Sequence, residues 1–328
     1  MHKKMEKTSK DALFRVRSSR SCVRKGCQLY LSNFRRIVKA SWLPATLFAV
    51  CVSILGTIAV IQYPRLNLTA FVNPDSMPLL FDNYMVVFAV SLLAFIVGGL
   101  MESATYSCMF RLLAEHKDTG VIPIPKRLIE FSRQWAWRTI KAFLGTLLLA
   151  DIMAIIVTAI VYGITVGINK MGGETLISSY ASNMAAFFIT LVFAAPLFHV
   201  VMKYILTPNA KFWPSAWSSY RDGFRHLGII ITSLIMATLV ISLVSAVICL
   251  PAIVVAIANF QANLGLLFGD PLGMPSYIVP LTAIAMAFAG FVEVMTRSVV
   301  FFITYYIYGS IEIQENEKNK FNKEIQNI

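Results

Sequence analysis

The chain has 328 residues, of which 57% are hydrophobic and only 14% are charged, and its mean hydropathy is +0.67. Soluble globular domains carry about 25% charged residues, so this composition excludes an ordinary soluble protein. The 29 Lys and Arg exceed the 17 Asp and Glu, which gives a formal net charge of +12.

Six long apolar runs dominate the chain. A bilayer core about 30 Å thick requires about 20 apolar residues per helix. The runs that satisfy this length are 42–62, 84–109, 142–163, 184–206, 227–250 and 280–308. Residues 1–40 contain no apolar core of the signal-peptide kind, so the first run is expected to direct insertion. The sequence therefore predicts an all-α polytopic bundle of six transmembrane helices.

The basic residues are distributed unevenly between the two sides of the predicted bundle. Of the 29 Lys and Arg, only Arg65 and Lys170 fall on the side opposite the termini. The positive-inside rule then predicts two cytoplasmic termini and a multi-pass protein of the plasma (inner) membrane. This topology, together with attraction to anionic lipid, explains the net charge, so no nucleic-acid partner is predicted.

A short aromatic segment recurs before each predicted hairpin. The segment "YLSNFRR" at 30–36 is echoed by "YRDGFRH" at 220–226, and "FSRQWAW" at 131–137 keeps two aromatics at i and i+4. Each runs directly into an apolar helix. We predict three repeats of a cytoplasmic amphipathic helix plus a transmembrane hairpin. The domain boundaries are a basic arm at 1–22, repeats at about 23–115, 121–206 and 211–309 within a transmembrane domain at 23–309, and a polar, weakly ordered cytoplasmic tail at 310–328.

The amphipathic segments hold the tryptophans. In the third segment Trp213, Trp217, Tyr220, Phe224 and Leu227 recur at spacings that lie on one face of a helix. Indole rings favour the headgroup boundary, so the predicted interfacial anchors are Trp42, Trp135, Trp137, Trp213 and Trp217. Two interpretations stay open for such a stripe: contact with interfacial lipid, or packing against the spanning helices. In the second segment the stripe consists of Leu128, Phe131 and Trp135.

Two returning helices share a polar pattern. The runs "GLMESATYS" at 99–107 and "GFVEVMTRS" at 290–298 align at an offset of 191 and keep a Gly, a Glu, a Thr and a Ser in register. The candidate polar intramembrane site comprises Glu102, Thr105, Ser107, Glu293, Thr296, Arg297 and Ser298. The glycines Gly98, Gly99 and Gly290 would let helices approach closely.

A carboxylate within a bilayer requires a partner. Arg297 follows Glu293 by four residues, the spacing at which helical side chains meet, whereas Tyr106 occupies that position after Glu102. Arg297 could also reach Glu102. The site is either a proton, cation or polar-substrate site, or a structural cluster that joins the first and third repeats. Asp151 and His199 are further intramembrane candidates. His199 or Lys203 could pair with Asp151, and His199 could equally be hydrogen-bonded inside the bundle.

The sequence contains no recognisable catalytic or metal-binding motif. No HExxH, GxSxG or phosphate-loop motif occurs, and the five cysteines lack the His or Cys partners of a zinc set. We therefore predict that the protein is not an enzyme and holds no metal or cofactor. Its expected partners are membrane lipid and, in addition, a protein partner or further copies of itself.

The pattern in "SAWSSYRDGFRHLGII" resembles that of a loose group of bacterial integral membrane proteins. The group includes uncharacterised six-helix inner-membrane families and the membrane domain found with some glycerophosphodiester phosphodiesterases. The resemblance implies a six-helix bundle with cytoplasmic amphipathic helices, and it transfers no catalytic residue. The predicted function is a non-enzymatic membrane-organising or partner-binding protein; the alternative is a transporter or channel that uses Glu102 and Glu293.

Overall fold

The structure is a computed structural model that describes residues 13–64, 66, 77–124, 133–170, 175–268 and 275–326. Within these ranges the chain forms helices and no strands. The structure confirms six helices that are long and apolar enough to cross a membrane. These candidate spans are Phe34–Gln62, Asn83–Thr119, Arg133–Gly167, Tyr180–Leu206, Leu227–Ile248 and Ile278–Gln326.

Individual helices are longer or more divided than the apolar runs. They are α2 (Ser19–Ser32), α3 (Phe34–Thr57), η1 (Ile58–Gln62), α5 (Met77–Thr119), α6 (Arg133–Lys170), α7 (Thr175–Ala194), α8 (Leu197–Leu206), α9 (Phe212–Arg225), α10 (Leu227–Ile248), α11 (Leu250–Leu267) and α12 (Ile278–Gln326). The fourth span is divided between α7 and α8 at Pro196, where proline ends the preceding helix.

The fifth apolar run extends beyond the predicted end at 250. After Cys249 the chain turns into α11, in which Pro251 occupies the first turn, where its missing N–H has no helical partner to lose. Helix therefore continues beyond the predicted end of the fifth run. Together α10 and α11 exceed the length that one bilayer crossing requires.

The chain terminus differs from the prediction of a weakly ordered tail. Helix α12 has 49 residues and continues to Gln326, a length of about 73 Å at 1.5 Å per residue. Its last turns are polar and exposed. Before that point Ser310 accepts a hydrogen bond from the Arg17 backbone, in the segment that precedes α2, and Glu312 and Glu315 contact α8 and α9. The tail is thus anchored by contacts that the sequence pattern did not reveal.

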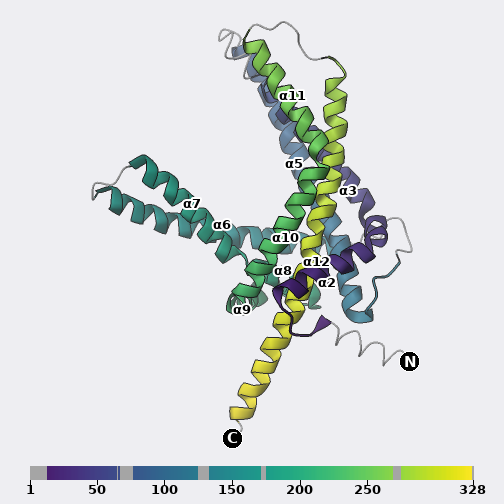
Figure 1. The fold of residues 1–328 in the computed structure, drawn as a ribbon, viewed down its shortest axis with the longest axis vertical. Coiled ribbons are helices and arrows are strands. Elements are labelled where there is room, and N and C mark those ends of the chain that lie inside the picture. The colour runs from purple at the N-terminus through teal and green to yellow at the C-terminus, as the bar shows by residue number, and fades with distance from the viewer. Residues whose placement is uncertain are drawn as a thin grey trace.

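The helices α2, α8 and α9 gather around α12 near one end of the molecule, which we call the collar end (Figure 1). Leu13 lies in the same core, against Gly309, so the predicted arm at 1–22 is partly docked; residues 1–12 lie outside the described ranges. Most buried side chains belong to this end, including Phe110, Met202, Phe302 and Tyr305.

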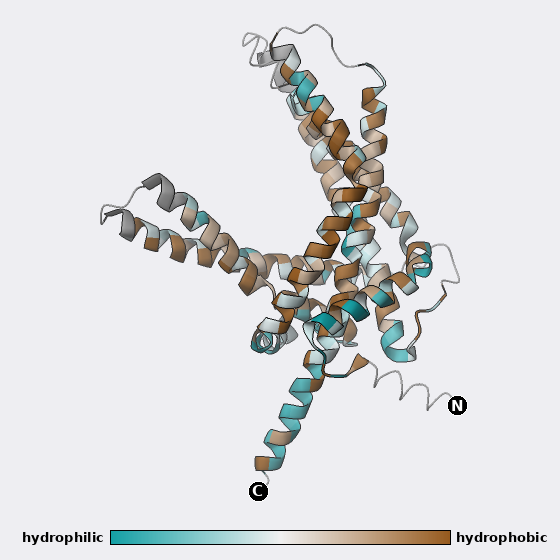
Figure 2. Cartoon of the chain, viewed as in Figure 1, coloured by the Kyte–Doolittle hydropathy of each residue, from teal (hydrophilic) through white to brown (hydrophobic). Residues whose placement is uncertain are grey.

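Away from the collar end the helices separate into two groups. Figure 1 shows α3, α5, α10, α11 and α12 running together, while the hairpin of α6 and α7 diverges from them. Both groups present predominantly hydrophobic surfaces, whereas α2 and the last turns of α12 are hydrophilic (Figure 2). This distribution is typical of helices that face lipid along most of their length.

Candidate functional site

The helices that carry the predicted acids both pack against α3. A β-carbon added at Gly290 of α12 would lie 2.8 Å from Val52 Cβ, and one at Gly98 of α5 would lie 3.3 Å from Cys51 Cβ. These two glycines therefore permit the close approach that the sequence predicted. Gly99 has no such neighbour within 4 Å, so a close approach there was wrongly predicted.

On α12 the predicted pair is present. Arg297 Nε donates a hydrogen bond to Glu293 Oε1 at 2.6 Å, across one helical turn. The Arg297 side chain is nevertheless 57% exposed, because it extends along the surface of the bundle. The pair neutralises the carboxylate locally, which lowers the cost of placing it within a membrane.

On α5 a different donor takes the equivalent place. The Tyr106 hydroxyl donates to Glu102 Oε1 at 2.7 Å, again across one turn. Arg297 bonds to Glu293 instead of Glu102, although it lies within electrostatic range of Glu102 and Tyr106. From the sequence, Tyr106 was taken only to mean that no cation follows Glu102 by four residues. That its phenol could donate a hydrogen bond to Glu102 was overlooked.

The four hydroxyl groups of the candidate site bond to their own helices. Each donates to a backbone carbonyl three or four residues earlier: Thr105 to Met101, Ser107 to Ala104, Thr296 to Val292 and Ser298 to Val294. Such bonds satisfy buried hydroxyls without using a second helix. The structure thus gathers the two acids, Tyr106 and Arg297 into one cluster, while the hydroxyls pair with backbone.

The Tyr106 ring connects this cluster to the α6–α7 hairpin. It makes edge contacts with Phe301 of α12, at 4.8 Å between ring centroids, and with Phe143 of α6, at 5.7 Å. Phe110 joins the same group. These aromatic contacts hold α5, α6 and α12 together next to the collar end, one to two helical turns after the acids along α5 and α12.

The two further candidates do not pair with each other. Asp151 is exposed on α6, and within the described residues it has no hydrogen bond or ion pair. His199 on α8 is 1% exposed, and neither of its ring nitrogens has a hydrogen-bond partner among the described residues. Its ring lies 5.8 Å from that of Tyr308.

The aromatic stripe of α9 faces outward. Trp213, Trp217 and Phe224 are 57%, 76% and 43% exposed, while the smaller side chains Ala216 and Ser219 are buried. Of the other predicted anchors Trp42 and Trp137 are exposed, and Trp135 is partly buried against the core. In the second predicted stripe Leu128 and Phe131 lie outside the described residues.

The exposed rings of α9 form an ordered series. Trp217 stacks on Tyr220 and Tyr220 on Phe224, at centroid distances of 6.3 and 6.1 Å, and Phe224 stacks on Phe193 of α7 at 5.9 Å. The Tyr220 hydroxyl donates to the Phe193 carbonyl at 3.0 Å, and partial burial raises the pKa of this phenol. We call Trp213, Trp217, Tyr220 and Phe224 the aromatic face.

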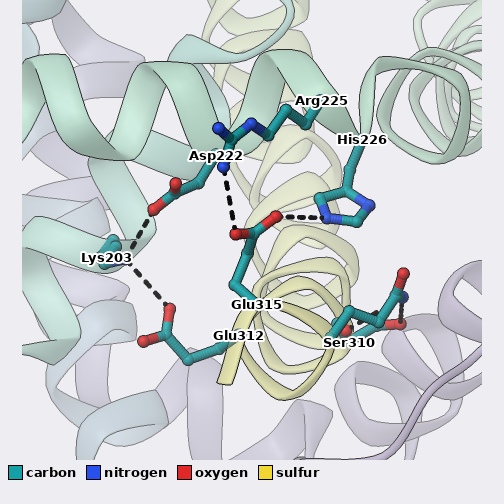
Figure 3. A network of polar contacts seen from close by, with 8 residues as sticks. Lys203, Asp222, Arg225, His226, Ser310, Glu312 and Glu315 are labelled. Atoms are coloured by element: carbon teal, nitrogen blue, oxygen red, sulfur yellow. Dashed lines mark hydrogen bonds and ion pairs between the residues drawn. The ribbon is translucent and has the colours of Figure 1, made fainter. Parts of the chain in front are cut away.

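An ion-pair network fixes α9 on α12 (Figure 3). Lys203 of α8 bonds to Asp222 of α9 at 3.1 Å and to Glu312 of α12 at 3.3 Å. Glu315 of α12 is only 8% exposed. It accepts from Arg225 at 3.4 Å and from the His226 ring at 3.1 Å. This network was not predicted from the sequence, because its partners lie far apart along the chain.

The end of α8 is held by cations from two other helices. Arg138 of α6 donates to the carbonyls of Tyr204 and Thr207, and Lys117 of α5 donates to the Leu206 carbonyl at 2.8 Å. The last carbonyls of a helix lack partners within it, and cations stabilise that negative end of the dipole. The collar end is therefore joined by charges as well as by apolar packing.

The acids of the candidate site are engaged in hydrogen bonds and an ion pair. In the described part of the chain, no three His, Cys, Asp or Glu side chains are placed to hold a metal ion. Glu102 and Glu293 each accept a hydrogen bond from a donor on the same helix. Such paired acids stabilise helices within a membrane.

No protein-family model, curated protein or solved structure matches the chain. The resemblance to bacterial six-helix membrane families therefore stays a prediction. The chain fits a multi-pass membrane protein on its six apolar helices.

Proposed function

We propose that this multi-pass membrane protein is non-enzymatic and organises lipid, or binds a partner protein, at the cytoplasmic face of the plasma membrane. The observation that carries the proposal is the outward orientation of the aromatic face on α9. Tyr220 and Phe224 pack on Phe193 of α7, but packing within the described chain does not explain the exposure of Trp213 and Trp217. Interfacial lipid is the occupant that large aromatic rings with flanking basic residues favour.

The basic residues on the same helix support a preference for anionic lipid. Lys211 and Arg221 are exposed on or next to α9, whereas Arg225 is paired with Glu315. Basic residues at a membrane surface each contribute about 1 kcal/mol of attraction to an anionic leaflet. The uneven distribution of Lys and Arg supports cytoplasmic termini, which would place the collar end at that leaflet.

Corresponding contacts in two segments support the proposed three-repeat arrangement. Tyr30 and Tyr220, 190 residues apart, donate through their hydroxyls to carbonyls of spanning helices: Met295 of α12 at 2.8 Å and Phe193 of α7 at 3.0 Å. Under the repeat assignment, each tyrosine bonds to the returning helix of the preceding repeat in cyclic order. Such contacts would arrange the amphipathic helices around the bundle, each bonded to the returning helix of the preceding repeat.

Two of the four buried positions of α2 follow the same offset. Cys22 and Gly26 of α2 are buried, as are Phe212 and Ala216 of α9, each 190 residues later. The corners that lead into the spanning helices, Asn33 and His226, lie 193 residues apart and have similar backbone angles, with φ −116° and ψ 13° at Asn33 and φ −108° and ψ 28° at His226. These correspondences favour a common origin for the two segments.

Lipid retention tests the proposal. Wild-type protein and the double variant Trp213→Ala/Trp217→Ala are purified, washed with detergent and compared for bound anionic phospholipid. We expect the double variant to retain less. A matched control, Tyr162→Ala on the far part of α6, removes an equally exposed aromatic ring and should retain the wild-type amount. Equal retention by all three proteins would contradict the proposal.

A further inference from the structure

The α6–α7 hairpin has a large apolar surface that no described part of the chain covers. Helix α7 packs along α6, and α6 contacts α5, α8 and α9. Phe143 contacts Tyr106 and Phe301, and Leu149 and Ala150 also pack against the core. Farther along, the hairpin diverges from the other helices (Figure 1). Large exposed side chains of α6 include Leu144, Leu147, Leu148, Ile152, Ile155, Ile156 and Ile160.

Asp151 lies in the middle of this surface. Lys141, whose ammonium lies 5.3 Å from the Trp137 ring centroid, marks the interfacial end of α6. Asp151 follows Lys141 by ten residues, or about 15 Å along a helix, which is half the thickness of a bilayer core. Lipid can cover the surrounding apolar side chains, but it offers a carboxylate neither a cation nor a hydrogen-bond donor at that depth.

We infer that Asp151 and the exposed face of α6 bind a membrane-spanning helix of another protein that carries a lysine or arginine at mid-bilayer depth. Charge complementarity carries the inference, since the face consists of apolar side chains around a single acid. The surface is separate from the aromatic face of α9, so the inference does not depend on the proposed function.

Two other occupants fit the charges less well. A second copy that packs α6 against α6 about a two-fold axis would place two Asp151 carboxylates opposite each other. Closure of the hairpin onto its own bundle would bring Asp151 toward Arg297, but Arg297 already bonds to Glu293 and lies within electrostatic range of Glu102. A third carboxylate around one guanidinium would leave excess negative charge in the membrane.

A synthetic single-span helix can serve as the probe. Full-length protein with an acceptor dye on its N-terminal amine is reconstituted in phosphatidylcholine vesicles with a donor-labelled polyleucine helix that has one central lysine. Energy transfer measures association, and the same helix with a central leucine is the reference. We expect wild-type protein to bind the lysine helix about fivefold to thirtyfold more tightly than the reference, the range of a polar contact between membrane helices.

Variants of the chain decide the outcome. Asp151→Leu should bind both helices equally, while Thr158→Leu, at an exposed position two turns away, should keep the wild-type preference. Equal binding of both helices by wild-type protein would overturn the inference, as would a lysine preference that survives Asp151→Leu. Cysteine cross-linking in a chain whose native cysteines are serines completes the test. Disulfide dimers through Asp151→Cys would assign the face to a second copy. An internal bridge between Asp151→Cys and Arg297→Cys would assign it to the chain's own bundle. Either result would overturn the inference.

Discussion

The Tyr106 hydroxyl donates a hydrogen bond of 2.7 Å to the Glu102 carboxylate one turn earlier on α5. The same spacing on α12 joins Arg297 to Glu293 at 2.6 Å. The two acids that share a sequence pattern are thus satisfied by unlike donors, one neutral and one cationic. Both partners come from the acid's own helix, so each pair can form before the helices pack.

Removal of the phenol hydroxyl should weaken the fold. In Tyr106→Phe, partly buried Glu102 loses its donor, and we expect a loss of about 1 kcal/mol in the free energy of unfolding. Unfolding in mixed detergent micelles measures this change. Tyr162→Phe, on an exposed ring of α6, is the control and should be neutral. A Tyr106→Phe protein as stable as wild type would show that the bond contributes nothing.

The acids are not expected to carry protons or cations across the membrane. In proteoliposomes that enclose a pH-sensitive dye, wild-type protein should give no flux above that of empty vesicles at any pH. Glu102→Gln and Glu293→Gln should leave this result unchanged. A pH-dependent flux that either variant abolishes, with folding intact, would favour the transporter alternative instead.

Loss of one carboxylate should loosen the collar end. Glu315→Gln removes the buried partner of Arg225 and His226, and we expect a local cost of about 1–2 kcal/mol, since the Arg225 side chain is 44% exposed and partly screened. Amide hydrogen exchange across residues 212–226 and 308–318 should then accelerate about tenfold. Glu317→Gln, one of the exposed positions on α12, is the matched control. Unchanged exchange in Glu315→Gln would remove the network from the anchoring of α9.

The Cys22 thiol reports on the docking of α2. Burial raises the pKa of Cys22 from 9.0 to about 11, with Arg17 opposing the shift. Because the folded-state pKa lies above the unfolded value, the protonated thiol stabilises the fold below pH 9, and this contribution falls as the pH rises toward 11.

Alkylation of the native protein checks this expectation. At pH 8 about one Cys22 thiol in a thousand is ionised, so modification should be at least about a hundredfold slower than in the denatured chain. The rate should rise steeply between pH 9 and 11. Native and denatured protein that react equally fast at pH 8 would mean that α2 is not docked.

The sequence predicted those features that follow from bilayer thickness and helical spacing. Apolar runs identify the six spans because each must cover the hydrocarbon core, and the spacing of Arg297 from Glu293 identifies their pair. The Tyr106–Glu102 bond has the same spacing and was within reach, had phenol been considered as a donor. The exposed orientation of Trp217 could not be predicted, because one amphipathic stripe can face either lipid or protein.

Tertiary contacts explain the remaining differences. The polar composition of the tail predicted weak order, whereas Glu312 and Glu315 reach Lys203 and Arg225, more than eighty residues away. No local pattern specifies such pairs.

The central claim is that the aromatic face of α9 lies in the lipid interface. We would measure tryptophan fluorescence from a variant whose single indole is Trp217, with Trp42, Trp135, Trp137 and Trp213 replaced by Phe. The protein is reconstituted in vesicles whose lipids carry bromine either near the headgroup or near the bilayer centre. We predict strong quenching by the shallow bromines and weak quenching by the deep ones. Emission that neither lipid quenches would place Trp217 away from the bilayer and contradict the claim.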